Sequence, residues 1–90
     1  MYKLVHPIDV TVTGDHRVHL QFEDGREGEV DFSQFEWIGV FEPLEDPRYF
    51  ALVTINPEIR TIAWPNDADI APETLYHWVT EGLDATWDID

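Results

Sequence analysis

The chain has 90 residues and a formal net charge of −14, because 19 aspartates and glutamates face only 5 lysines and arginines. Phosphate backbones and anionic membranes are bound mainly through Lys and Arg, so this charge argues against direct binding of nucleic acid or of a membrane surface. No cysteine is present, which excludes disulfides, thiolate metal sites and cysteine nucleophiles.

The first third of the chain alternates apolar and polar residues with a period of two, over residues 8–13, 17–23 and 27–32. This pattern predicts three antiparallel strands with one buried face and one exposed face. Residues that lie opposite each other share a face, so Leu20 must face Gly28 rather than a glutamate. That register requires a three-residue loop that ends at Gly25, which would adopt a left-handed conformation.

The same parity argument predicts a first loop of three residues, Gly14-Asp15-His16, with Val12 opposite Val18. On the exposed face it places Arg17 opposite Asp31 and His19 opposite Glu29. Opposite charges therefore face each other across these strands.

After Phe32 the alternation ends. Residues 33–38 predict one helical turn with Ser33 as its N-cap and Gly39 as its stop, and residues 41–44 are expected to be irregular. Asp46 followed by Pro47 is typical of an N-cap and the first position of a helix. Two further strands are expected over residues 50–55 and 59–64, around a turn at 56–58.

The clearest helix begins at Ala71-Pro72-Glu73 and ends at Gly82, with an apolar stripe of Leu75, Trp78 and Val79. The order of elements predicts an α+β fold. It consists of an antiparallel meander of three strands plus a two-stranded hairpin, and the C-terminal helix covers one face of the sheet. We expect a single domain over residues 1–83 and a short acidic tail over 84–90.

No pattern of side chains points to catalysis or to a bound metal. His16 and His19 are three apart, which on a strand sends them to opposite faces. Glu73, His77 and Glu81 share one face of the last helix, where either a divalent ion or solvent would be their neighbour. We expect no catalytic residue, no cofactor and no metal ligand, because no constellation of nucleophile, base and oxyanion donors is recognisable.

Two acidic segments that contain tryptophan are candidate partner-binding sites. In the first, Trp64-Pro65-Asn66-Asp67-Ala68-Asp69-Ile70, the candidate residues are Trp64, Asn66, Asp67 and Asp69. The alternative is a plain strand-to-helix connection whose Trp64 packs into the core. In the second, the tail, Trp87 is the candidate; that segment would pair as an edge strand, bind a basic, apolar groove on a partner, fold back on its own domain, or stay disordered.

The stretch Ile62–Tyr76, with Trp64-Pro65-Asn66 and Leu75-Tyr76, resembles the signature of a small bacterial family called domain of unknown function 2442. Members of that family typically have Trp-Pro-Asn-Gly at the end of a strand, then Ala-Asp, and Leu-Tyr in the following helix. The resemblance covers nearly the whole chain. Asp67 stands where the family usually has Gly, and Asp tolerates a left-handed conformation better than most residues.

The resemblance implies a compact α+β domain without catalytic residues. It also implies that some relatives are antitoxin partners of small toxins, and that others carry an appended helix-turn-helix. The sequence up to Asp90 leaves no room for that appendage, so binding to DNA through it is not expected.

The leading hypothesis is a non-enzymatic, cytoplasmic protein-interaction module, antitoxin-like in the sense of those relatives, whose acidic surface suits a basic protein partner. The second is a small ligand- or metal-binding domain or enzyme that uses the acids near Trp64. The third is a structural domain whose acidic surface is an adaptation to salt, as in halophile proteins. A homodimer through an exposed sheet edge is compatible with all three.

Overall fold

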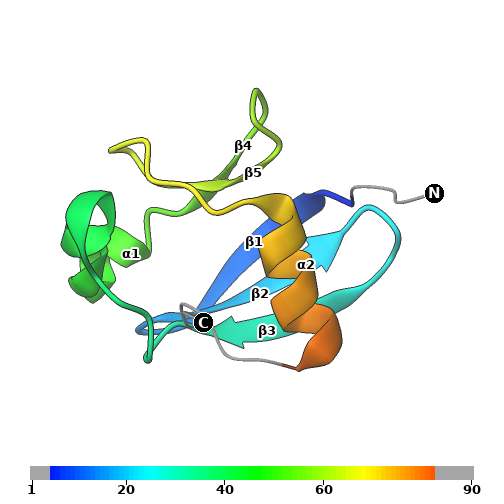
Figure 1. Ribbon diagram of the computed structural model, residues 1–90, viewed down its shortest axis with the longest axis horizontal. Helices are drawn as coiled ribbons and strands as arrows, with labels where there is room; N and C mark the ends of the chain where they lie inside the picture. Colours follow the sequence, from blue (N-terminus) through cyan, green and yellow to red (C-terminus); the bar gives the residue numbers. More distant parts are fainter. Residues whose placement is uncertain (1–4, 83–90) are drawn as a thin grey trace.

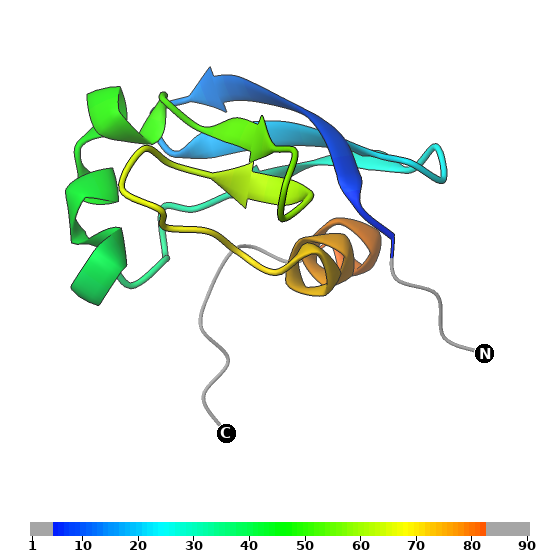
Figure 2. The same ribbon diagram turned by 90° about the horizontal axis from the view of Figure 1, so that it is seen from above.

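The computed structural model describes residues 5–82, which form two antiparallel sheets and three helical segments. In chain order these are β1 (Pro7–Gly14), β2 (Arg17–Phe22), β3 (Glu27–Asp31), the 3₁₀ helix η1 (Gly39–Glu45), α1 (Pro47–Phe50), β4 (Thr54–Asn56), β5 (Thr61–Ala63) and α2 (Pro72–Glu81). The order β1-β2-β3 makes one sheet, β4-β5 the other, and α2 lies on one face of the larger sheet (Figures 1 and 2). The predicted α+β fold is confirmed.

The predicted register of the meander is confirmed for β2 and β3. Leu20 lies opposite Gly28 and Arg17 opposite Asp31, and Gly25 has a φ of +92°. The first loop is shorter than predicted. Val12 does face Val18, but Gly14 pairs with Arg17, since a bulge between Val12 and Gly14 places one extra residue in β1.

The segment between β3 and β4 differs from the prediction. Residues 33–38 form no helical turn, because the Asp31 carboxylate accepts the Ser33 N–H at 2.8 Å and closes a local turn instead. Gly39, with a φ of +58°, begins η1 rather than ending a helix. Residues 41–44, expected to be irregular, belong to η1. The predicted cap at Asp46 is confirmed, since its carboxylate accepts the Arg48 N–H at 2.9 Å.

Both strands of the hairpin are shorter than predicted. Phe50 belongs to α1, because the helix capped by Asp46 continues through it, and Trp64 has already left β5 to enter a turn. The residues of β5 are buried on both sides of the strand.

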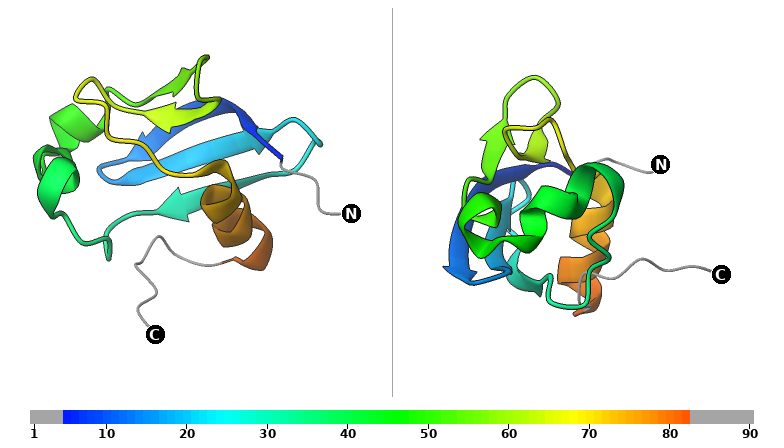
Figure 3. Two further views of the ribbon diagram at one scale, coloured as in Figure 1. Left: turned by 45° about the horizontal axis from the view of Figure 1, so that its top comes forward. Right: turned by 90° about the vertical axis from the view of Figure 1, so that its left-hand side faces the viewer.

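The core is enclosed by the larger sheet, by α2 on one face of that sheet, and by η1 and α1 at one end of it (Figure 3). Leu75 and Trp78 of α2 are buried in it, as predicted, and Val79 packs against Gly28 of β3. Much of the core is aromatic, and its rings form a network of edge-on and tilted contacts. This network includes Phe32, Phe35, Trp37, Phe41, Phe50, Trp64 and Trp78.

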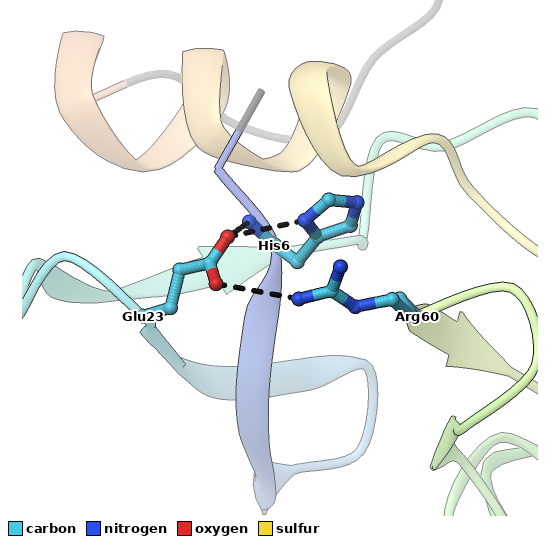
Figure 4. A network of polar contacts seen from close by, with 3 residues as sticks. All are labelled: His6, Glu23 and Arg60. Atoms are coloured by element: carbon cyan, nitrogen blue, oxygen red, sulfur yellow. Dashed lines mark hydrogen bonds and ion pairs between the residues drawn. The ribbon is translucent and has the colours of Figure 1, made fainter. Parts of the chain in front are cut away.

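Glu23 joins three parts of the fold, as Figure 4 shows. Its Oε2 accepts hydrogen bonds from the backbone N–H of His6 at 2.9 Å and from His6 Nδ1 at 3.1 Å. Its Oε1 accepts one from Arg60 Nη2 at 3.3 Å. The segment before β1, the β2–β3 loop and the β4–β5 loop therefore meet at one carboxylate. These bonds, first those from His6, hold the pKa of Glu23 below its ordinary value of 4.5.

This network makes the stability of the domain depend on pH. Because the pKa of Glu23 is lower in the folded state than in the unfolded chain, its contribution is present above pH 4.5 and lost as the pH falls further. We expect Glu23→Gln to lower the denaturation midpoint at neutral pH, and the gap to wild type to close as the pH falls below 4.5. Urea unfolding at a series of pH values measures this.

Glu58→Gln, in the β4–β5 loop, is the matched control, because within residues 5–82 Glu58 has no ion pair. A gap between wild type and Glu23→Gln that stays constant with pH would contradict this account of Glu23.

Candidate functional site

The segment from Trp64 to Ala68 is a tight, hydrogen-bonded turn that begins where β5 ends. Asp67 N–H donates to the Trp64 carbonyl and Trp64 N–H donates to the Ala68 carbonyl, both at 2.9 Å. Asp67 has a φ of +70°. These bonds and this φ are typical of a three-residue hairpin loop whose last residue is left-handed. Beyond the turn, Asp69 bridges back to Ala63.

The chain contains the same turn a second time, between β2 and β3. There Gly25 N–H donates to the Phe22 carbonyl at 3.0 Å and Phe22 N–H donates to the Arg26 carbonyl at 2.8 Å. Gly25 occupies the left-handed position that Asp67 occupies in the Trp64 turn. The comparison within one molecule shows that Asp67 stands at a position that favours glycine, which agrees with the expectation from the family pattern.

We expect Asp67→Gly to stabilise the domain by about 0.5 kcal/mol. A left-handed conformation costs a side-chain-bearing residue about 1–2 kcal/mol, and the larger entropy of glycine in the unfolded chain offsets roughly half of that. Asp67→Ala should instead destabilise it, since alanine adopts the conformation less readily than aspartate. Urea unfolding of both variants measures this; a less stable Asp67→Gly would contradict the assignment of the turn.

The Trp64 side chain belongs to the core. It is 3% exposed, its ring packs against Phe50, and its Nε1–H donates to the Phe50 carbonyl at 2.9 Å. The interpretation of Trp64 as a core residue is therefore confirmed. Its indole connects the turn to Phe50, the last residue of α1. Only the exposed residues of the turn are therefore available to a partner.

Asn66 holds the turn against η1. Its Nδ2 donates to the Val40 carbonyl at 2.8 Å, and its Oδ1 accepts the Ala68 N–H at 3.2 Å. The turn and η1 therefore lie side by side at one end of the molecule (Figures 1 and 2). Asp67 and Asp69 are exposed there. Trp87, the fifth candidate residue, lies outside the described residues.

Carboxylates from η1 join those of the turn at this end. Glu42, Glu45, Asp46 and Tyr49, together with Pro43, line an open pocket of about 600 Å³. We call the exposed carboxylates of η1, of the turn and of Asp69 just beyond the turn the acidic end; its members are Glu42, Glu45, Asp67 and Asp69. No sequence pattern pointed to the two glutamates, because the bond from Asn66 to Val40, which brings η1 beside the turn, joins residues 26 positions apart and leaves no local pattern.

Each arginine of the described residues already pairs with a carboxylate that is not a member of the acidic end. Arg17 pairs with Asp31 at 3.3 Å, as its predicted position required, and Arg48 pairs with Asp46 at 3.3 Å, which lowers the pKa of that carboxyl. Arg26 and Arg60 pair with carboxylates of the β2–β3 loop. Within residues 5–82 no arginine or histidine forms an ion pair with the acidic end.

A second open pocket, of about 320 Å³, lies beside the β1–β2 turn and includes His16 and Arg17 in its wall. His16 Nε2 donates to the Leu44 carbonyl at 2.9 Å, and its ring packs against Trp37 and Phe50. This histidine therefore links the β1–β2 turn to η1. Across the described part of the chain, no three histidine or carboxylate side chains come together as metal ligands would.

Comparison with models of protein families gives a match. The model of a family described as "Protein of unknown function (DUF2442)" matches residues 7–81. The chain belongs to this family. Comparison with curated proteins and with solved structures gives no significant match. None of the helices in residues 5–82 has the length and apolar character needed to cross a membrane.

The structure explains the residues by which this DUF2442 domain resembles its family. Trp64 and Asn66 fix the turn to α1 and η1, and Leu75 is fully buried. Tyr76 Oη donates to Asp24 Oδ2 at 2.6 Å, a bond that joins α2 to the β2–β3 loop, lowers the pKa of Asp24 and raises that of Tyr76. These side chains stabilise the fold, so the residues of the family signature have structural roles.

Proposed function

We propose that this DUF2442 domain is a non-enzymatic protein-interaction module whose acidic end binds a basic protein. The observation that carries the proposal is the set of exposed carboxylates at the acidic end, which lack ion pairs within residues 5–82 while the arginines of that region pair with other carboxylates. Such a surface attracts Lys and Arg side chains and speeds the encounter with a positively charged partner.

The rigidity of the acidic end also supports this function. The turn is closed by its own backbone bonds and fixed to η1 through Asn66, so the backbone that carries its carboxylates is in place before a partner arrives. A surface organised in advance loses less conformational entropy on binding. An antitoxin-like role, which the family resemblance implies for some relatives, is one form of this function, with a basic toxin as the partner.

The experiment is to co-express and co-purify the chain with the product of the adjacent reading frame, and to measure their affinity by isothermal titration calorimetry. The proposal predicts a complex whose affinity falls as salt is added, since the attraction between the charged surfaces is screened. In the antitoxin-like form, co-expression also restores growth that the neighbour alone inhibits. The proposal would be overturned if the chain formed a complex with neither adjacent gene product.

A further inference from the structure

Two large apolar side chains stand in solvent beside the acidic end. Ile38 is 62% exposed and Val40 is 48% exposed. They flank Gly39, whose φ is +58° and around which the structure leaves open space. We call residues 38–40 the Ile38–Val40 patch.

The backbone of this patch is fixed on both sides. Ile38 N–H donates to the Glu36 carbonyl at 3.1 Å, and Phe41 N–H donates to the Ile38 carbonyl at 3.0 Å. The Val40 carbonyl accepts the bond from Asn66. The two apolar side chains are therefore presented by a rigid segment, so binding them orders little of this chain.

Acidic residues flank the patch along the chain. Glu36 and Glu42 lie two residues outside it on either side along the chain, and Asp67 follows the asparagine that holds it. Neither glutamate has an ion pair within residues 5–82, and the same is true of Asp67. An apolar pair framed by negative charge is complementary to an apolar side chain flanked by Lys or Arg.

We propose that the Ile38–Val40 patch is the anchor point of the acidic end, and that it takes an apolar residue from a basic segment of a different protein. This inference rests on the proposed function and names the residues that would carry it. A second copy of this chain is a poorer occupant, because pairing the two patches would bring the same carboxylates of both copies together.

The test is selection of random peptides displayed on phage against the immobilised full chain, followed by affinity measurement on synthetic copies of the enriched peptides. The variants are Ile38→Ser with Val40→Ser, the milder Val40→Ala, and Ile8→Ser as the matched control. Ile8 is also a large exposed side chain, at 54%, but it lies on β1. Circular dichroism verifies that each variant is folded.

We expect the enriched peptides to combine Lys or Arg with an aliphatic or aromatic residue. Their affinity should fall about tenfold or more in the double variant, fall less in Val40→Ala, and stay unchanged in Ile8→Ser. Enriched peptides that bind the double variant as well as wild type would overturn the inference, as would a selection that enriches no peptide. Either result would leave the complex with the adjacent gene product to decide the proposed function separately.

Discussion

Trp64→Phe is expected to lower the free energy of unfolding by about 2–3 kcal/mol. The substitution removes the hydrogen bond from Nε1–H to the Phe50 carbonyl, which is buried and keeps its bond from the Val53 N–H at 3.2 Å. Loss of a hydrogen bond whose acceptor keeps another partner costs about 0.5–1.5 kcal/mol, and the smaller ring adds the cost of a partly filled cavity. Because α1 has only four residues, loss of this hydrogen bond also destabilises the C-terminal end of the helix.

Trp78→Phe is the matched control, since Trp78 is buried to a similar degree but makes no indole hydrogen bond within residues 5–82. It should cost about 1–2 kcal/mol, the cavity contribution alone. Urea unfolding followed by far-ultraviolet circular dichroism suits both variants, because each changes the fluorescence. If both variants lowered the free energy of unfolding equally, the bond from Trp64 to Phe50 would not stabilise the turn.

Gly28→Ala is expected to destabilise the domain by about 1–3 kcal/mol, the usual cost of overpacking. A Cβ atom at position 28 would lie 2.8 Å from Cγ1 of Val79, closer than carbon atoms pack. Val79 is a short, β-branched side chain with few alternative rotamers in a helix, so α2 itself must shift. The glycine therefore sets how closely α2 approaches the sheet.

A double variant separates this steric effect from any other. Val79→Ala removes the methyl groups that the new Cβ would meet, so Gly28→Ala should cost little in that background. Gly14→Ala is the control for a glycine in a strand, because its Cβ would meet Arg17 Cβ at an ordinary 3.5 Å. Calorimetric melting of the single and double variants measures the coupling free energy between positions 28 and 79. If the two substitutions lowered the stability additively, the contact between Gly28 and Val79 would not set the packing of α2.

The parts of the fold that could be predicted from the sequence are those determined by neighbours along the chain. The register of the meander followed from side-chain parity and from the loop that ends at Gly25, and α2 followed from Pro72 and Gly82. The segment after β3 could not be predicted from propensity. There the side chain of Asp31 accepts the Ser33 N–H, which the side chain of Glu36 would have bonded in a capping box.

The candidate site was predictable only in part, for a similar reason. The family pattern pointed to the turn and to the left-handed Asp67. The bond from Asn66 to Val40, which brings η1 and its carboxylates beside that turn, spans 26 residues of the chain and has no signal in either segment alone. The burial of Trp64 likewise depends on α1, a helix whose single turn the sequence indicated only through Asp46 and Pro47.

The acidic end is tested most directly by the affinity for the adjacent gene product across a series of salt concentrations. The comparison is between wild type, a variant with Glu42→Gln and Asp67→Asn, and a control with Glu58→Gln and Glu81→Gln. Both variants lose the same charge, and both draw on exposed carboxylates without ion pairs in residues 5–82. We predict that the first variant binds about tenfold or more weakly and less salt-dependently, while the control binds as wild type does. Equal affinity of the two variants would contradict the assignment of partner binding to the acidic end.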